Sequence, residues 1–390
     1  MDIEQIRKDI TDYGEKVFLD SAGSSLMPKS VVRTINRYLL EEEKFGGYAV
    51  AESRAKEIAD FYSQVALLIG AKPKNIAFTH DATDAYTKAL LSISFNNNDV
   101  IITTDDDYAS NQIQFISLQK RFGIKIFRIK TLENGELDIT DFQKLVDDHN
   151  PKLLAVTHVP TNSGLIQNVE AIGEICHNQQ ITFLLDACQS IGQLDVNVNK
   201  IKCDFLSATG RKFLRGPRGT GFLYVSDRLL KKGYSPLMVD GGGAIWKRKD
   251  HFELLKTAKR FQTWEAPYAL LLGLREAARY ANKIGLKNIQ AYNQKLMLQL
   301  RENLNGIQGV KLYDKGLNNC NILTFRKDHK SLKEITEKLT QNNVFYTISK
   351  KEWGVIDFEK KGIDWAIRLS PHYFNTKEEV HTISKIIDGI

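Results

Sequence analysis

The chain has 390 residues, of which 42% are hydrophobic and 26% charged, an ordinary globular composition that suggests two or three domains. Its 26 glycines and 8 prolines are too few for a collagen-like or low-complexity chain. The 54 basic and 47 acidic residues leave a net charge of +7. Because the two signs alternate along the chain, a mixed solvated surface is favoured over a nucleic-acid-binding stripe.

Neither the cysteine spacing nor the N-terminus indicates a metal site or a membrane. Cys176, Cys188, Cys203 and Cys320 have no Cys-x-x-Cys spacing and no nearby histidine pair, so we expect reduced structural thiols and no zinc site. The N-terminus is acidic from Asp2, unlike a signal peptide, and no run of 18 apolar residues occurs. We therefore expect a cytoplasmic protein that does not contact a membrane.

The first 70 residues contain an extended segment at Phe18-Leu19-Asp20, a turn rich in serine and glycine, and two helices. We expect this part, residues 1–70, to pack with a small domain and the active site. From about residue 75 to 225, short β-branched runs alternate with amphipathic helical stretches, which is typical of βαβ units in a mainly parallel sheet. We expect the large domain that contains them to span residues 71–265. The predicted strands are residues 75–79, 100–104, 125–129, 153–158, 181–186, 205–207 and 221–225, and the helices between them include residues 84–94 and 169–177.

A second domain is predicted over residues 266–390. Two long helical patterns, about 265–284 and 286–304, are expected to connect it to the large domain. The pattern then becomes strand, strand, helix, strand, strand, helix, which suits a small C-terminal α/β domain. These elements are predicted at residues 310–313, 321–325, 332–341, 344–348, 365–369 and 377–387.

Polar residues follow several predicted strands, at the positions where ligands bind in α/β sheets. The first strand leads through Asp81-Ala82-Thr83 directly into a helix, whose free N–H groups and positive end could hold a phosphate. A simple N-cap explains that segment equally well. Asp186 ends a mostly apolar strand and, if buried, needs a cation or strong donors. A protonated pyridine nitrogen would meet that need, although many such aspartates only cap a helix.

A cluster of cations follows the strand at residues 205–207. Arg211 and Lys212, with Arg215 and Arg218 in the Gly/Pro-rich loop after them, are expected to form a dense positive site beside the phosphate loop. A nucleic-acid-binding loop would look similar. Lys212 favours a different interpretation, because a desolvated lysine near other cations has a lowered pKa and can form a Schiff base with an aldehyde.

In this order and spacing, the residues resemble the class V family of pyridoxal-phosphate enzymes, over about residues 18–387. That family includes cysteine desulfurases, selenocysteine lyases, carbon–sulfur lyases and isopenicillin N epimerase-like proteins. The strongest motif is Asp186-Ala187-Cys188-Gln189 followed by Thr209-Gly210-Arg211-Lys212, similar to the family's Asp-x-x-Gln and Ser/Thr-x-His/Arg-Lys. The resemblance implies the α/β fold of the PLP-dependent transferases of fold type I, with a seven-stranded, mainly parallel sheet. It also implies pyridoxal 5'-phosphate as cofactor, an amino-acid substrate and a homodimer with shared active sites.

The resemblance also implies roles for individual residues. Lys212 would bind the cofactor covalently and later move a proton, and Asp186 would pair with the pyridine nitrogen. Arg368 would bind the substrate carboxylate, and Ala22 lies in a loop over the substrate. The remaining implied contacts are Ala82, Thr83, Thr209 and Arg211 at the phosphate, Gln189 at the ring hydroxyl, Tyr108 and Thr161 at the ring, with Asn162 as an alternative to Thr161, and Thr263 and Trp264 in a loop that reaches the neighbouring subunit's cofactor.

Two departures from the family bear on the reaction. Desulfurases that form a persulfide carry a cysteine in the loop before the strand of the last arginine, and residues 348–364 contain none. Tyr108 stands where desulfurases carry a histidine stacked on the ring. We therefore expect a carbon–sulfur lyase that performs β-elimination without a persulfide cysteine. An epimerase or aminotransferase would use the same residues, and a basic nucleic-acid-binding protein that uses the 211–218 loop is the alternative from another class.

Overall fold

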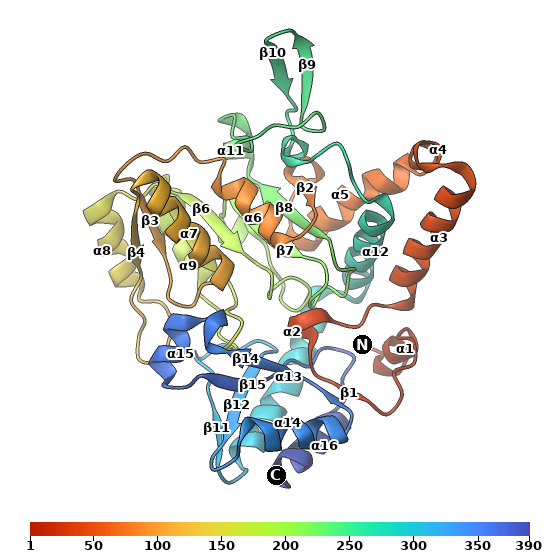
Figure 1. Cartoon of the computed structure of the whole chain (residues 1–390), viewed down its shortest axis with the longest axis vertical. Coiled ribbons are helices and arrows are strands. Elements are labelled where there is room, and N and C mark those ends of the chain that lie inside the picture. The colour runs from red at the N-terminus through yellow and green to blue at the C-terminus, as the bar shows by residue number, and fades with distance from the viewer.

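The computed structural model describes all 390 residues, and a seven-stranded sheet forms the centre of its larger part (Figure 1). The strand order is β2-β8-β7-β6-β5-β3-β4, and only β8 runs antiparallel to its neighbours. This confirms the predicted α/β class and the mainly parallel sheet. The strands are β2 (Ile76–Thr79), β3 (Val100–Thr103), β4 (Lys125–Arg128), β5 (Leu153–Thr157), β6 (Thr182–Asp186), β7 (Phe205–Thr209) and β8 (Gly221–Val225).

Helices cover both faces of this sheet, which explains why its strands read as continuous apolar runs. Successive side chains of a strand point to opposite faces, so Leu184 packs in one apolar cluster, and its neighbours Phe183 and Leu185 pack in another. The first cluster lies under α6 (Ala82–Leu90), α7 (Ala109–Phe122) and α11 (Asp227–Lys231). The second lies under α5 (Ala55–Ile69), α8 (Ile139–His149), α9 (Val169–Asn178), α10 (Val198–Ile201) and α12 (Tyr268–Ile284).

The smaller part is an antiparallel sheet of order β11-β12-β15-β14 with helices on one side. Its elements are α13 (Leu286–Asn305), β11 (Val310–Leu312), β12 (Leu323–Lys327), α14 (Leu332–Gln341), β14 (Thr347–Lys350), α15 (Val355–Lys361), β15 (Trp365–Leu369) and α16 (Lys377–Asp388). The strand predicted at residues 344–348 is in fact broken at Tyr346. Its first half, β13 (Val344–Phe345), pairs instead with β1 (Val17–Phe18) of the N-terminal segment.

The N-terminal segment contacts both parts of the molecule. The β1–β13 pairing ties it to the small sheet, whereas α3 (Lys29–Phe45) and α5 pack against α12. Two short helices, α1 (Ile3–Lys8) and α2 (Ser21–Ser24), precede α3, and α4 (Gly47–Ser53) follows it. The division of the chain at residues 70 and 265 stays a prediction.

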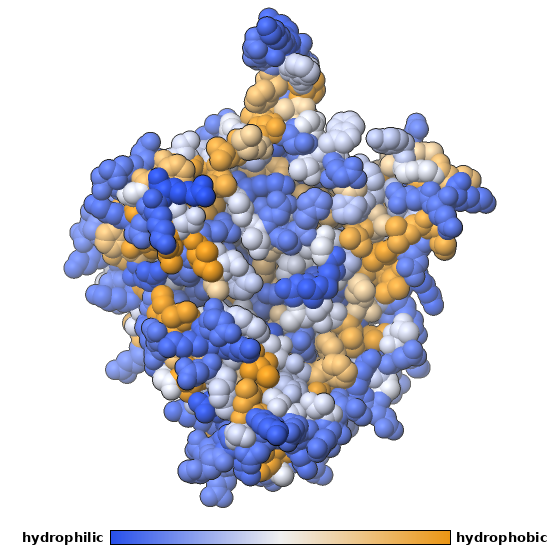
Figure 2. All heavy atoms as spheres, in the orientation of Figure 1, coloured by the Kyte–Doolittle hydropathy of each residue, from blue (hydrophilic) through white to orange (hydrophobic).

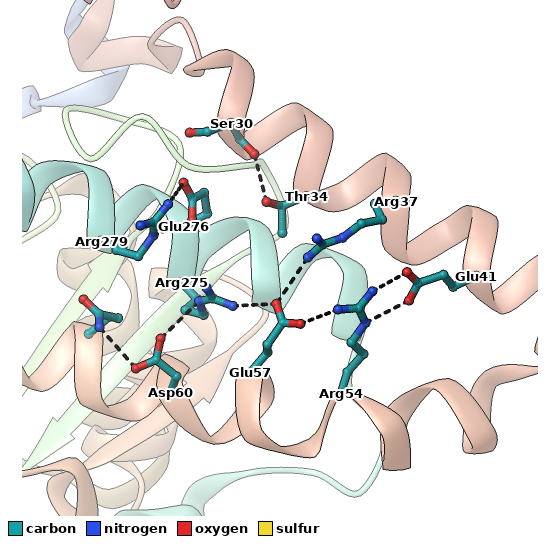
Figure 3. A network of polar contacts seen from close by, with 11 residues as sticks. Ser30, Thr34, Arg37, Glu41, Arg54, Glu57, Asp60, Arg275, Glu276 and Arg279 are labelled. Carbon is teal, nitrogen blue, oxygen red and sulfur yellow. Dashed lines mark hydrogen bonds and ion pairs between the residues drawn. The ribbon is translucent and has the colours of Figure 1, made fainter.

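An ion-pair network joins α3, α5 and α12 and includes Arg54, which lies between α4 and α5 (Figure 3). Glu57 accepts hydrogen bonds from Arg54 at 2.5 Å and from Arg275 at 2.9 Å, and Arg54 also contacts Glu41. Each pair is partly exposed, so it contributes only about 0.2–1 kcal/mol to stability. The apolar residues between the helices therefore supply most of the stability, and the network helps to set how the helices are oriented.

A β-hairpin, β9 (Ala244–Arg248) and β10 (His251–Leu254), projects from the molecule at the top of Figure 1. Figure 2 shows an apolar stem below a hydrophilic tip. The sequence analysis did not predict this hairpin, nor helix α15. No helix of the chain has the length and apolar character that crossing a bilayer requires.

A substitution at Gly173 tests how closely α9 packs against α10. A Cβ atom at this position would lie 1.7 Å from the carbonyl oxygen of Ile201, which is backbone and cannot rotate away. We expect Gly173→Ala to lower the free energy of unfolding by roughly 1–3 kcal/mol, measured by urea denaturation. At Gly306 the nearest atom is 3.5 Å away, so Gly306→Ala should stay within about 0.5 kcal/mol of the parent. Equal stability of the two variants would contradict the close approach.

Candidate active site

Two adjoining cavities lie where β5, β6 and β7 end, at the carboxyl edge of the large sheet. The first, which we call the cofactor cavity, has a volume of about 260 Å³. The second, the substrate cavity, has a volume of about 480 Å³ and lies between the large sheet and β15. Six residues line both cavities: Tyr108, Thr161, Gln189, Arg211, Lys212 and Arg218.

Strand register brings the first groups together. In the sheet Thr157 pairs with Asp186, and Asp186 pairs with Ser207, so the ends of the three strands are level. Lys212 follows the end of β7 by three residues, and its side chain is buried, with its Nζ atom 5.8 Å from the centre of the Tyr108 ring. Burial removes water from the ammonium group and lowers the pKa of Lys212 to about 8.

Asp186 is held by two neutral donors. One carboxylate oxygen accepts a hydrogen bond of 3.0 Å from the Asn111 side chain, and the other accepts one of 2.9 Å from the Cys188 amide. The side chain is buried and lines the cofactor cavity. A buried carboxylate in this position can pair with a protonated ring nitrogen.

A second buried aspartate fixes the backbone beside Tyr108. Asp107 accepts hydrogen bonds from the Thr103 hydroxyl and, at 2.6 Å, from the Thr157 amide. Burial raises its pKa to about 6. The Tyr108 amide in turn donates to the Thr157 hydroxyl at 3.2 Å. These bonds hold the loop after β3 against the end of β5, so that the Tyr108 ring lies at the border of the two cavities.

Thr161 and Asn162 point in different directions. Thr161 lines both cavities. Asn162 lines neither, and its carbonyl oxygen accepts hydrogen bonds from Thr324 at 2.9 Å and Lys361 at 2.8 Å. The structure therefore favours Thr161 over Asn162 as the residue available to a ligand.

The expected phosphate residues line one end of the cofactor cavity. Ala82 and Thr83 begin α6, and Asp81 caps this helix by accepting a hydrogen bond of 2.8 Å from the Asp84 amide. The simple N-cap interpretation is therefore right for Asp81, while the positive end of α6 still borders the cavity. The same cavity is lined by Thr209 and Arg211.

Gln189 and Ala22 connect the cavity to the N-terminal segment. The Gln189 Nε2 atom donates to the Ala22 carbonyl oxygen at 3.3 Å, while its buried Oε1 atom has no partner. A buried acceptor without a donor is rare, and a ligand hydroxyl group can satisfy it.

Arg368 lies on β15 with its side chain 5% exposed. Its Nη2 atom contacts Asp20 at 3.4 Å and Thr347 at 3.2 Å, and its buried Nε atom has no partner. The guanidinium group lines the substrate cavity, where its free donors suit a carboxylate.

The prediction of a dense cluster of arginines after Lys212 is wrong for Arg215. Arg215 has a positive φ of 62°, is fully buried and donates to the Leu26 carbonyl oxygen at 2.8 Å. Its guanidinium group lies 5.0 Å from the Tyr373 ring centre and 4.9 Å from that of Phe374. Arg215 is therefore not at the surface of the loop, and Lys212 is buried too, so the nucleic-acid-binding alternative lacks its row of exposed cations.

Thr263 and Trp264 line neither cavity, and both are exposed. Their assignment to a loop that reaches the neighbouring subunit stays a prediction. The sequence analysis missed other residues of the site, namely Asp107, Asn111 and Trp353. Asn111 lines neither cavity and acts through its hydrogen bond to Asp186, a contact between segments 75 positions apart that no local spacing indicates.

Together these groups fit pyridoxal phosphate. The cofactor cavity offers a lysine for the aldehyde, a carboxylate for the ring nitrogen, an unpaired acceptor for the hydroxyl group, and a helix start with an arginine for the phosphate. No cluster of three or more metal-binding side chains is present.

Comparisons with known proteins agree with this fit. A family model described as Aminotransferase class-V matches residues 17–383. A probable cysteine desulfurase of Methanothermobacter thermautotrophicus is 28% identical to the chain, over 100% of this chain and 98% of that protein. A probable cysteine desulfurase of Pyrococcus abyssi is 27% identical, over 99% of this chain and 97% of that protein. The apo structure of a cysteine desulfurase from Thermococcus onnurineus NA1 is 27% identical, with a TM-score of 0.91 over 99% of this chain and 97% of that one. The cystine C-S lyase C-DES, solved with its reaction product cysteine persulfide, shares the fold with a TM-score of 0.84 at 20% identity, over 96% of this chain and 97% of that one.

Lys212→Ala is expected to abolish covalent attachment of pyridoxal phosphate, because no other lysine lines the cofactor cavity. The check is the visible absorption spectrum after the cofactor is added and the excess removed, followed by borohydride reduction and mass spectrometry. Exposed Lys120→Ala serves as the control and should behave as the parent does. Reduced cofactor on a peptide without Lys212 would refute the assignment.

The rate at which the apoprotein takes up pyridoxal phosphate should rise with pH, because only the neutral amine attacks an aldehyde. With the pKa of Lys212 lowered to about 8, the neutral fraction increases roughly tenfold from pH 7 to pH 9 and then levels off. The neutral fraction of an ordinary exposed lysine would increase about a hundredfold over the same interval and would not level off. Stopped-flow absorbance between pH 6.5 and 10 distinguishes the two profiles.

Proposed function

The chain belongs to the aminotransferase class-V family and is a pyridoxal-phosphate-dependent enzyme, and on that premise we propose that it is a carbon–sulfur lyase. Its substrate would be cysteine or a cysteine-derived amino acid, cleaved between Cβ and sulfur by β-elimination. The observation that carries this proposal is the composition of the substrate cavity, since none of its lining residues is a cysteine.

The four cysteines lie elsewhere and are poor nucleophiles. Cys176, Cys203 and Cys320 are buried, and burial raises the pKa of each thiol far above its usual value. Cys188 lines the cofactor cavity next to Asp186, and burial together with this carboxylate likewise raises its pKa. A protein thiol that accepts sulfur from the substrate would have to be a reactive thiolate, and none of these four meets that requirement.

The segment before β15 supports the same proposal, because residues 348–364 contain no cysteine where persulfide-forming desulfurases carry one. It carries Trp353 at the rim of the substrate cavity and continues into α15. Asp357 of α15 contacts Lys315 and Lys361, each at 2.7 Å, and Lys315 also contacts the buried Asp106 at 3.0 Å. These ion pairs attach the loop to the body of the protein, on the side of Tyr108.

Different residues of the two cavities can bind the substrate and move the proton in a β-elimination. Bound pyridoxal phosphate supplies an electron sink that stabilises negative charge at Cα. Arg368 would hold the substrate carboxylate, and the bidentate geometry of its guanidinium group would orient the Cα–H bond. Lys212, with a pKa near neutrality, would accept the Cα proton. The sulfur leaving group needs little acid assistance, because a thiol has a pKa of about 8.5.

We further propose that the enzyme is a homodimer. Trp264, in the loop expected to reach the other subunit, is 69% exposed, and Met238 is 84% exposed. The projecting hairpin exposes Trp246 and Phe252. Exposed apolar side chains on the hairpin and on the loops at its base are typical of a surface that a second subunit covers.

We propose a cytoplasmic location because the cysteines are free. All four are free, and none forms a disulfide. Proteins of oxidising compartments more often use their cysteines in disulfides.

Product analysis tests the proposed reaction and separates it from the alternatives. With L-cysteine or L-cystine we expect pyruvate and ammonia in equal amounts, with sulfide or persulfide as the sulfur product. Lys212→Ala should lower the rate by at least about 100-fold. Alanine as the main product would indicate a persulfide-forming desulfurase, and the opposite enantiomer of the substrate would indicate an epimerase. An oxo acid formed together with an aminated cofactor would indicate an aminotransferase.

A further inference from the structure

The substrate cavity contains more positive charge than a simple amino acid requires. Arg211, Lys212, Arg218 and Arg368 line it, and the only carboxylate among its lining residues is Asp20. A cluster of like charges favours a ligand of opposite charge, so an unpaired cation in this set can bind an anionic group of the ligand.

Three of the four cations have a place in the proposed function. Lys212 is assigned to the cofactor aldehyde. Arg211 donates to the Gly23 carbonyl oxygen and lines the cofactor cavity at its phosphate end. Arg368 contacts Asp20 and keeps free donors for the substrate's α-carboxylate.

Arg218 is the remaining cation. It is exposed, it forms no hydrogen bond or ion pair, and it lines both cavities. Its loop does not need the side chain, because backbone and hydroxyl groups hold the loop. Gly216 donates to the Gly210 carbonyl oxygen at 2.7 Å, and the Thr220 hydroxyl donates to the Pro217 carbonyl oxygen at 2.7 Å. The guanidinium group is therefore available to a ligand.

We propose that Arg218 binds a second anionic group, a carboxylate or sulfinate carried by the side chain of the substrate. The inference rests on the proposed function, because it takes the α-carboxylate to lie at Arg368. It narrows the substrate class to amino acids with an acidic side chain, among which L-cystine carries its second carboxylate beyond the scissile Cβ–S bond. Arginine suits this task because its planar fork binds a carboxylate through two parallel hydrogen bonds.

Arg218→Gln and Arg218→Lys in the holoenzyme test the proposal, with L-cystine and S-methyl-L-cysteine as substrates. For L-cystine we expect kcat/KM to fall by about 10- to 100-fold in Arg218→Gln, the usual effect of losing a charge-assisted hydrogen bond, and much less in Arg218→Lys. For S-methyl-L-cysteine, whose side chain has no charge, the change should stay within about threefold. An equal loss for both substrates would overturn the proposal.

Two binding measurements complete the test. The dissociation constant of pyridoxal phosphate should be unchanged in Arg218→Gln, whereas an increase above about tenfold would assign Arg218 to the phosphate and overturn the proposal. L-Glutamate and L-glutamine, which have no leaving group on Cβ, are compared by the change they cause in cofactor absorbance. The parent should prefer glutamate and Arg218→Gln should not. This comparison requires no elimination, so it decides the role of Arg218 even if the proposed reaction is wrong.

Discussion

A buried carboxylate needs donors or a cation, and in this protein the site is arranged around that requirement at Asp186. The strand register sets Asp186 level with Thr157 on one side and Ser207 on the other. Asn111 and the Cys188 amide both donate to the carboxylate and are uncharged, and no cation of the protein forms an ion pair with it. Lys212 reaches the same cavity because β7 lies beside β6.

The substrate cavity depends on segments that are far apart in the sequence. Asp20, Thr347 and Arg368 contact one another although they come from the N-terminal segment and two strands of the small sheet. Two pairings hold these segments together: β1 with β13, and Asp20 with Ser370. The N-terminal segment therefore forms part of the wall of the site, so the site requires the two ends of the chain to be packed together.

The elements that could be predicted from the sequence are those that depend on neighbouring residues. The strands of the large sheet are buried on both faces, so their apolar runs are visible in the sequence, and the polar residues that follow them mark the site. The inward turn of Arg215 could not be predicted, because the aromatic rings that surround it come from Tyr373 and Phe374, more than 150 positions later. The break at Tyr346 has a similar origin, since the partner of β13 is near the N-terminus. The role of Asn111 depends on the placement of α7 beside β6.

The ion pairs of α15 have a mechanical consequence. Asp106 and Asp357 are both buried, and Lys315 contacts both of them, so moving α15 outward would separate Asp357 from Lys315. Such a movement would break a buried ion pair, which costs free energy. The ion pair between Asp357 and Lys315 therefore attaches the segment that carries Trp353 to the body of the protein. In the proposed lyase, sulfur released at this rim would leave by diffusion, as a small molecule.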